Sequence, residues 1–371
     1  MTHRLSGRLR WRPTATALLA AVILAACQSS ASPSTSVDGG TQSSPDASST
    51  PELRDTPSPG PVAHVATGLA VVRFPGGGSP VSHVFVVDAE GTLNQVTGLG
   101  AETSGAAMPV WSPDRSQLLV GSPKVGGGVT FQLSVVNADG SDERVVAQTD
   151  GTFIPPVDWS PDGESFVFTD LIESVGGPNE PSMWLVVPAT GEITRLGTGT
   201  RPRWFPDGQR LTFLATVSDP STPGAEIVET QILDLDGSQP QPFALGSDPT
   251  WSPDGTAVLF QADDGSLTLA NADGTDPRTI GPGDTPVWSP DGSRFVYAYG
   301  TNADGLPLLA AMERDGRRIW STVVGSSPTW SPDGGRLAVE ILHPELLVEV
   351  LDAETADLLW QTDGTMPSWT E

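Results

Sequence analysis

The sequence is poor in cysteine and in basic residues. Cys27 is the single cysteine among 371 residues, which excludes a disulfide within one chain. Lysine and arginine together number 19, against 45 aspartates and glutamates, and the formal net charge is −26. Because a body this acidic repels phosphate backbones and anionic headgroups, we expect no nucleic-acid partner.

Long apolar runs are also missing. The most apolar stretch, residues 15–26 (ATALLAAVILAA), is shorter than the roughly 20 residues that a membrane-spanning helix needs. It follows a basic segment, Arg4 to Arg12, and ends in Leu-Ala-Ala-Cys at residues 24–27. This arrangement resembles the lipobox of bacterial lipoproteins, in which the cysteine sulfur is acylated and the chain is cleaved before it. We predict a lipoprotein signal peptide at residues 1–26 and lipid attachment at Cys27. The alternative is an ordinary cleaved signal with an unrelated cysteine.

The segment that follows, residues 27–61, has almost no large apolar side chains. It is rich in serine, proline, threonine, aspartate and glycine. Such a segment cannot bury enough surface to offset the conformational entropy lost on ordering. We predict a disordered tether that separates the folded body from the membrane by roughly 30 Å on average, as expected for a flexible coil of this length.

Common catalytic and metal-binding motifs are absent from the sequence. It contains no H-E-x-x-H pair, no P-loop and no G-x-S-x-G nucleophile elbow. Beyond the signal the histidines are His64, His83 and His343, and their surroundings lack the spacing of metal ligands. We therefore predict neither a cofactor nor a metal, although so many acidic residues make chance carboxylate pairs unavoidable.

The dominant feature of the sequence is an internal repeat. The phrase Pro-x-Trp-Ser-Pro-Asp-Gly, or a close variant, recurs at intervals of 37 to 48 residues. A period near 40–45 residues is typical of the four-stranded blades of β-propellers. The repeated tryptophans are Trp111, Trp159, Trp204, Trp251, Trp288, Trp330 and Trp369.

Each repeat divides into four short strands. In the last complete unit these are residues 328–331, 336–341, 346–351 and 358–361, joined by turns of the Ser-Pro-Asp-Gly and Asp-Gly kind. Trp369 has no second strand after it, whereas residues 68–74 read as a second strand with no tryptophan strand before it. We therefore predict an all-β fold, a seven-bladed β-propeller over residues 62–371, closed by the C-terminal strand joining the first blade.

The repeated residues favour structural over functional readings. A tryptophan at the same place in every blade is expected to fill the wedge between neighbouring sheets, with an aromatic binding surface as the weaker alternative. Residues 137–142 and 271–276 resemble calcium loops but lack the glutamate at loop position twelve. We interpret these aspartates as hairpin turns.

The repeat resembles that of the TolB propeller and its WD-repeat-like relatives, over about residues 62–371. The resemblance implies a propeller in the cell envelope that binds proteins or small ligands. TolB itself is a soluble periplasmic protein with six blades and an additional N-terminal domain, whereas this sequence predicts seven blades and a lipid anchor. We therefore do not carry TolB's partners over to this chain.

One pair of charges stands out on the predicted inner strands. Asp158 and Arg203 each directly precede a repeated tryptophan, in adjacent blades. We expect them to pair near one mouth of the central channel, either as a structural ion pair or as part of a polar ligand site.

These observations favour a non-catalytic module. We predict an exported propeller, lipid-anchored and facing the periplasm or the cell exterior, that binds an envelope protein, a peptide or a glycan. The alternative is a propeller lyase or hydrolase with its site at the channel mouth, which would need convergent polar groups with perturbed pKa values.

Overall fold

The fold is described from a computed structural model of the chain. Cys27 and the predicted tether lie outside the described residues, as do His64 and His343. All the described residues fall within the compact unit Pro61–Glu371. They are residues 68–74, 81–88, 90–98, 105–124, 131–149, 152–172, 180–219, 222, 224–243, 245–341 and 346–369, with backbone alone for residues 152–156, 172 and 322.

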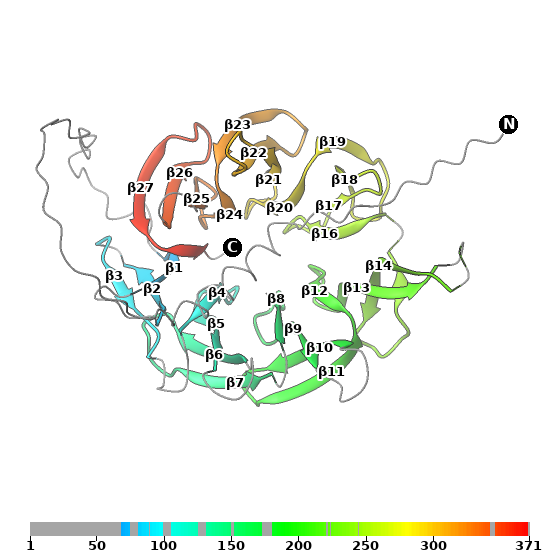
Figure 1. Cartoon of the computed structure of the whole chain (residues 1–371), viewed down its shortest axis with the longest axis horizontal. Helices are drawn as coiled ribbons and strands as arrows, with labels where there is room; N and C mark the ends of the chain where they lie inside the picture. The colour runs from blue at the N-terminus through cyan, green and yellow to red at the C-terminus, as the bar shows by residue number, and fades with distance from the viewer. Residues whose placement is uncertain are drawn as a thin grey trace, which may run out of the picture. The chain divides into compact units, whose positions relative to one another are not determined.

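The described residues form seven four-stranded antiparallel sheets arranged as blades around a ring, and they contain no helix (Figure 1). This confirms the predicted all-β, seven-bladed propeller. Blade 1 consists of β28 (Thr365–Ser368), β1 (Ala70–Arg73), β2 (His83–Val87) and β3 (Leu93–Gln95). Blade 2 consists of β4 (Ala107–Trp111), β5 (Gln117–Pro123), β6 (Phe131–Asn137) and β7 (Arg144–Gln148). Blade 3 consists of β8 (Thr152–Trp159), β9 (Phe166–Ile172), β10 (Glu180–Val187) and β11 (Glu192–Thr198).

The other four blades follow the same order from the ring axis outward. Blade 4 consists of β12 (Thr200–Trp204), β13 (Arg210–Ser218), β14 (Glu226–Asp234) and β15 (Gln241–Pro242). Blade 5 consists of β16 (Ser247–Trp251), β17 (Ala257–Gln261), β18 (Ser266–Asn271) and β19 (Arg278–Pro282). Blade 6 consists of β20 (Asp284–Trp288), β21 (Arg294–Thr301), β22 (Pro307–Glu313) and β23 (Arg318–Val324). Blade 7 consists of β24 (Ser326–Trp330), β25 (Arg336–Ile341), β26 (Leu347–Asp352) and β27 (Leu358–Asp363).

The ring closes through its last strand, as the sequence predicts. β28 pairs antiparallel with β1, so Ser368 lies opposite Ala70 and Thr365 lies opposite Val72. The indole N–H of Trp111 in blade 2 also donates to the Ser368 carbonyl at 3.2 Å. Strands from the two ends of the folded unit therefore share one sheet, which leaves no open inner edge at blade 1.

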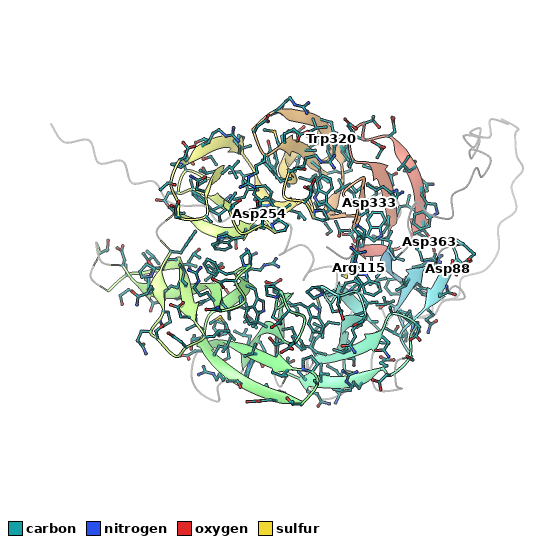
Figure 2. The ribbon with its side chains drawn as sticks, turned by 180° about the vertical axis from the view of Figure 1, so that it is seen from behind. Asp88, Arg115, Asp254, Trp320, Asp333 and Asp363 are labelled. Atoms are coloured by element: carbon teal, nitrogen blue, oxygen red, sulfur yellow. The ribbon has the colours of Figure 1, made fainter. Side chains whose placement is uncertain are left out.

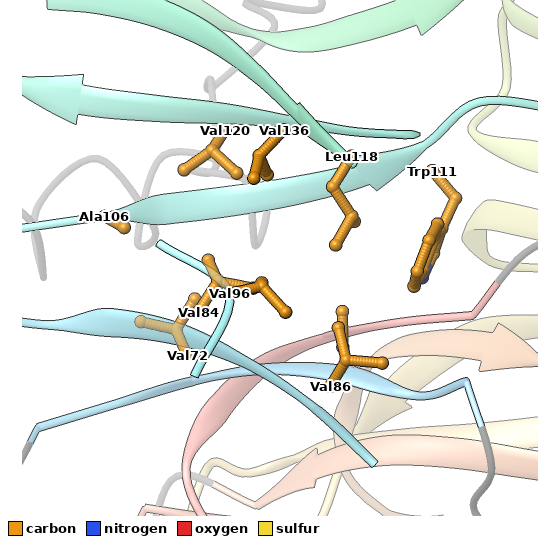
Figure 3. Close-up of a cluster of buried hydrophobic side chains, with 10 residues drawn as sticks. Val72, Val84, Val86, Val96, Ala106, Trp111, Leu118, Val120 and Val136 are labelled. Atoms are coloured by element: carbon orange, nitrogen blue, oxygen red, sulfur yellow. The ribbon is translucent and has the colours of Figure 1, made fainter. Parts of the chain in front are cut away.

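The core lies between neighbouring blades. Between blades 1 and 2, Val72 and Val86 face Trp111 and Leu118, and all four side chains are buried (Figure 3). All seven repeated tryptophans are likewise buried, with 2 to 9% of their surface exposed. Alternating apolar side chains on the two faces of each sheet thus fill the spaces between blades.

The Ser-Pro-Asp-Gly turns have the geometry that the sequence suggests. In blade 5 the Gly255 N–H donates to the Ser252 carbonyl at 2.8 Å, which closes a four-residue β-turn. The buried Ser252 hydroxyl donates to Asp254 Oδ1 at 2.5 Å, and the Ala257 N–H donates to that hydroxyl at 3.0 Å. The same serine–aspartate contact, at 2.5 to 2.7 Å, is made by Ser112, Ser160, Ser289 and Ser331.

Candidate functional site

The innermost strands surround the ring axis and share an unusual backbone position. Three residues before the tryptophan, six of the seven inner strands have a non-glycine residue in the left-handed region, with φ between 48° and 54°. Each lies at a register shift in its sheet. Such a conformation costs of order 1 kcal/mol for a non-glycine residue and is retained only where the surrounding structure imposes it. The six residues are Met108, Arg201, Asp248, Thr285, Ser327 and Met366.

Blade 3, which contains Asp158, departs from this pattern. Pro156 stands three residues before Trp159, and its ring excludes a positive φ. The register shift there is wider, between Ile154 and Asp158. The Asp158 carboxylate accepts the Trp204 backbone N–H of blade 4 at 2.7 Å, so it links the two blades.

The structure brings Asp158 and Arg203 together. Arg203 Nη1 lies 3.6 Å from Asp158 Oδ1, and the two side chains are 47% and 28% exposed. Enclosure by the protein raises the pKa of Asp158, and the Arg203 charge and the Trp204 N–H act in the opposite direction. Asp158 is therefore a carboxylate that is held between blades but remains in contact with solvent.

A second charged group on the inner strands was not expected from the sequence. Arg201 donates from Nη1 to both carboxylate oxygens of Asp248, at 2.9 and 2.7 Å. Asp284 of blade 6 interacts electrostatically with both Asp248 and Arg201. Burial and the Asp248 charge raise the pKa of Asp284, and the Arg201 charge opposes this shift. The alternation of charge at the same position of successive blades, Arg201 then Asp248, is the signal that would have revealed this group.

A hollow of about 600 Å³ lies elsewhere, between blades 4 and 5. Its floor is aromatic: the Phe205 and Trp251 ring centroids are 4.1 Å apart, and Phe243 meets Trp251 edge-on at 5.7 Å. Its apolar lining consists of Phe205, Pro206, Ile232, Pro242, Phe243, Leu245, Trp251 and Ala272, and its polar lining includes Asp207, Arg210, Asp254 and Asp273.

The hollow arises where blade 4 breaks the repeat. Phe205 stands in Phe-Pro-Asp-Gly where five other turns have the buried serine, so Asp207 loses its serine partner. Arg210 takes that place, with its guanidinium 2.7 Å from Asp207 and 4.2 Å from the Phe205 ring centroid. The Phe205 ring and residues next to the two-residue outer strand β15 line the hollow on the side of blade 4.

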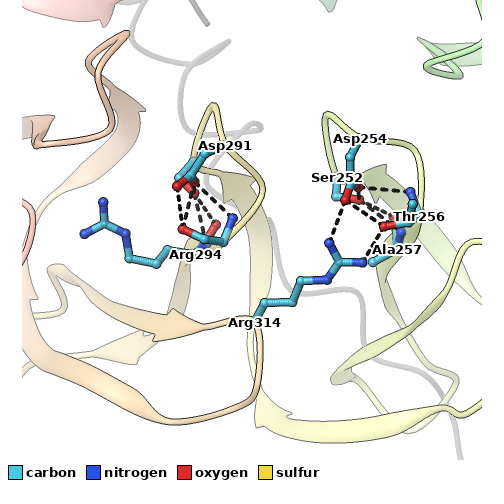
Figure 4. Close-up of polar contacts among 9 residues, drawn as sticks. Ser252, Asp254, Thr256, Ala257, Asp291, Arg294 and Arg314 are labelled. Atoms are coloured by element: carbon cyan, nitrogen blue, oxygen red, sulfur yellow. Dashed lines mark hydrogen bonds and ion pairs between the residues drawn. The ribbon is translucent and has the colours of Figure 1, made fainter.

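The rim of the hollow is anionic. Although partial burial opposes it, hydrogen bonds from Ser252, from the amide and hydroxyl of Thr256 and from Arg314 lower the pKa of Asp254 (Figure 4). The Thr275 hydroxyl and amide lower the pKa of Asp273. Seen from behind, Asp254 lies on the inner rim of the ring, as do Arg115 and Asp333, whereas Asp88 and Asp363 lie farther out (Figure 2).

Blades 4 and 5 also lack a contact that joins four other blade pairs. In those pairs the tryptophan indole N–H donates to the preceding blade's inner strand at 3.0 to 3.2 Å, from Trp111, Trp159, Trp288 and Trp330. Among the described contacts Trp251 makes no such bond, and the buried Trp204 indole nitrogen has no partner. Blade 4 is therefore joined to blades 3 and 5 without the indole hydrogen bond that joins the other four pairs.

The comparisons with known proteins identify the family. A family model of the TolB β-propeller domain matches residues 123–334, which is more than half of the chain. The chain belongs to the TolB β-propeller family. No curated protein matches it in sequence.

Solved structures show the same fold at low sequence identity. TolB from Acinetobacter baumannii is 18% identical over 83% of this chain and 67% of that one, with a TM-score of 0.51. An oligogalacturonate lyase in complex with manganese is 15% identical over 80% of this chain and 85% of that one, with a TM-score of 0.53. The oligogalacturonate lyase of Vibrio parahaemolyticus is 14% identical over 70% and 80%, with a TM-score of 0.50. These likenesses show a shared fold.

The residues singled out by the sequence are only partly assembled into sites in this TolB-family propeller. His83 Nδ1 lies 3.3 Å from the Thr97 carbonyl and 3.1 Å from Gln95 Nε2, within blade 1. The described ranges contain no group of three or more histidine, cysteine or acidic side chains placed to hold a metal ion. In the same part of the chain there is no helix with the length and apolarity needed to cross a membrane.

Proposed function

We propose that this TolB-family propeller is a non-catalytic, exported binding module, held at the membrane by a lipid on Cys27. Its ligand is a protein or peptide that inserts an apolar side chain, flanked by basic residues, between blades 4 and 5. The ligand site is the hollow lined by Phe205, Phe243 and Trp251. The glycan ligand expected as an alternative remains an outcome of the test.

The hollow is the observation that supports this proposal. Its volume of about 600 Å³ lies within the usual range for ligand sites, and an aromatic floor with a few polar groups at the rim is typical of them. The rim contains three carboxylates, from Asp207, Asp254 and Asp273, and two of them are paired, Asp207 with Arg210 and Asp254 with Arg314, which leaves Asp273 as the excess negative charge. A net negative rim around an apolar floor favours a side chain that is apolar and has a cation beside it.

Binding of blocked tripeptides to the full chain tests the proposal. We expect acetyl-Lys-Phe-Lys-amide to bind saturably by calorimetry, and acetyl-Glu-Phe-Glu-amide and acetyl-Lys-Ala-Lys-amide to bind at least tenfold more weakly. Phe243→Ala should weaken Lys-Phe-Lys about tenfold, which corresponds to about 1.4 kcal/mol. Asp273→Asn should weaken it less and should reduce its salt dependence, because it removes one rim charge.

A matched control separates the hollow from the general acidity of the surface. Asp139 has the same position in the hairpin of blade 2 that Asp273 has in blade 5, and in both the aspartate accepts from the residue two positions on. Asp139→Asn should leave peptide binding unchanged. Equal weakening by the two substitutions, or equal binding of the alanine peptide, would show that the hollow is not the site.

Membrane attachment is tested separately. Cys27→Ala should release the chain from the membrane fraction and should abolish its labelling by a radioactive fatty acid, because the thiol is the acylated group. Retention of Cys27→Ala in the membrane fraction would contradict the lipid anchor and would leave the peptide result unaffected.

The enzymatic alternative places its site at Asp158 and Arg203. Two observations favour it: the raised pKa of Asp158 beside a cation, and the fold shared with an oligogalacturonate lyase. Incubation with oligogalacturonate, followed by absorbance of unsaturated products, is the direct assay. We expect no turnover; turnover that Asp158→Asn or Arg203→Ala abolishes would replace the binding proposal.

A further inference from the structure

Blade 4 projects beyond its own sheet as a two-stranded ribbon. β13 and β14 pair continuously from Arg210–Asp234 to Ser218–Glu226. The inner strand β12 pairs with β13 no farther than Leu214, and the outer strand β15 pairs with β14 only at Gln231 and Ile232. Residues 215–218 and 226–229 therefore form a ribbon that reaches outward from the ring (Figure 1).

No other blade leaves its third strand so uncovered within the described ranges. In the other blades, pairing with the fourth strand begins at the first, second or third residue of the third strand, as at Ser266, Gln132 and Ser182. In blade 4 this pairing begins only at the sixth residue of β14. Pro240 and Pro242 have no N–H to donate, and β15 is reduced to two residues.

Among the residues that the structure describes, none pairs with the outer edge of β14 at residues 226–229, and the direction of the backbone groups along this edge follows from one hydrogen bond. The Phe243 N–H donates to the Thr230 carbonyl, so the backbone groups of Thr230 point outward, away from β13. Because these directions alternate along an antiparallel strand, those of Val228 and Glu226 point outward as well. Val228 is 66% exposed, the highest value among the exposed large apolar side chains, and Ile227 beside it is 38% exposed.

We propose that this edge, residues 226–229 of β14, binds an extended segment of a partner protein, which adds a strand in line with β15. Strand addition satisfies the outward N–H and C=O groups, and alternate side chains of the added strand meet Val228 or Ile227. The partner strand is basic, because Glu226 and Glu229 flank the apolar pair. A second copy of this chain is disfavoured, because it would bring a second pair of glutamates to the ladder on a molecule whose formal charge is −26.

Amide hydrogen exchange with a defined probe tests this proposal. The probe is a blocked hexapeptide of alternating lysine and valine, and its control replaces each lysine by glutamate. In the free protein we expect the Val228 amide to exchange freely and the Ile227 amide, which faces β13, to be protected. Saturating Lys/Val peptide should slow Val228 exchange at least tenfold, whereas the Glu/Val peptide should have no effect.

Two substitutions at one position separate the backbone ladder from the side chain. Val228→Pro removes an outward N–H that the β13–β14 ladder does not use, so the propeller should fold and peptide affinity should fall at least tenfold. Val228→Ala keeps the N–H and should weaken binding only a few-fold. Undiminished binding by Val228→Pro, a Val228 amide already protected in the free monomer, or equal binding of the acidic peptide would overturn the proposal. Concentration-dependent dimers with Val228 protected would also overturn it, in favour of self-pairing.

Discussion

Phe205 occupies a position at which five other blades have a buried serine. In those blades the serine hydroxyl joins the turn aspartate to the following strand, whereas in blade 4 Arg210 pairs with Asp207 and covers the Phe205 ring. At this one position, a phenylalanine ring therefore replaces the serine hydroxyl and its hydrogen bonds. The sequence shows this exchange as Phe-Pro-Asp-Gly in place of Ser-Pro-Asp-Gly, but it does not show that the Phe205 ring lines a hollow.

A second residue with a marked local effect is Glu340, whose side chain is fully enclosed near the ring closure, with 1% exposed. Its carboxylate accepts the Met366 N–H of β28 at 3.1 Å and the hydroxyls of Ser326 and Ser327 at 3.3 and 3.2 Å. Burial raises the pKa of Glu340, and these hydrogen bonds oppose the shift. The group that anchors the closing strand therefore costs stability when it is ionised.

Glu340→Gln should make stability less dependent on pH. The raised pKa means that the folded state holds the Glu340 proton more tightly, so this contribution to stability is complete below the unfolded pKa of about 4.5 and is lost as pH rises through the folded pKa. Glutamine retains an oxygen for the Met366 N–H and does not ionise. The stability of the variant relative to wild type should therefore be greater at pH 7.5 than at pH 4.5. Urea denaturation at pH 4.5 and pH 7.5 measures the difference. Exposed Glu354→Gln is the control, and a constant difference across this range would contradict the ionisation argument.

At the scale of elements, the strands follow their sequence patterns closely. Residues 336–341 form β25 with the predicted bounds. The longest second strand is β13, Arg210–Ser218, which runs beyond the last residue that the inner strand β12 covers. Residues 216–218 alternate polar and apolar side chains, and residues 226–229 place two apolar side chains between two glutamates. Neither pattern tells whether neighbouring strands cover these residues.

The projecting ribbon should be dispensable for folding. Replacing residues 216–228 by Asn-Gly would join Ala215 to Glu229, which lie directly opposite each other in the ladder, through a two-residue hairpin turn. Because a two-stranded ribbon adds little stability by itself, we expect the melting temperature to change by no more than about 2 °C, since roughly 1 kcal/mol produces a shift of this order in a unit of this size. Thermal unfolding followed by circular dichroism measures it. A loss of cooperative unfolding would show that the ribbon supports the ring.

At the scale of the whole molecule, the last strand determines whether the ring is closed. Trp369 is 4% exposed within a cluster that contains Leu69 and Val71 of blade 1 and Val348 and Val350 of blade 7. Its backbone N–H donates to Thr329 Oγ1 of blade 7 at 3.1 Å. Strand β28 therefore joins the first and last blades through both its backbone and its tryptophan.

Trp369→Ala should destabilise the propeller by about 3–5 kcal/mol, the usual cost of truncating a buried aromatic side chain. The whole ring should respond, because a gap at the closure exposes both neighbouring blades. Chemical denaturation measures the loss, and Leu359→Ala, which truncates a 40% exposed side chain of β27, should change stability by less than about 0.5 kcal/mol. Equal effects of the two substitutions would show that closure contributes little.

The sequence by itself determined the repeat, the strand order within each blade, the number of blades and the closing strand. These follow from local patterns, because the alternation of apolar residues, the turn residues and the spacing of the tryptophans are each set by neighbouring positions along the chain. Only the tertiary structure decided where the blades depart from the regular repeat and leave candidate binding surfaces. The hollow at Phe205 and Trp251, the pairing of Arg201 with Asp248 and the uncovered edge of β14 each depend on contacts between strands or blades. Such contacts depend on the relative lengths and registers of strands that are distant in sequence, and no single repeat contains that information.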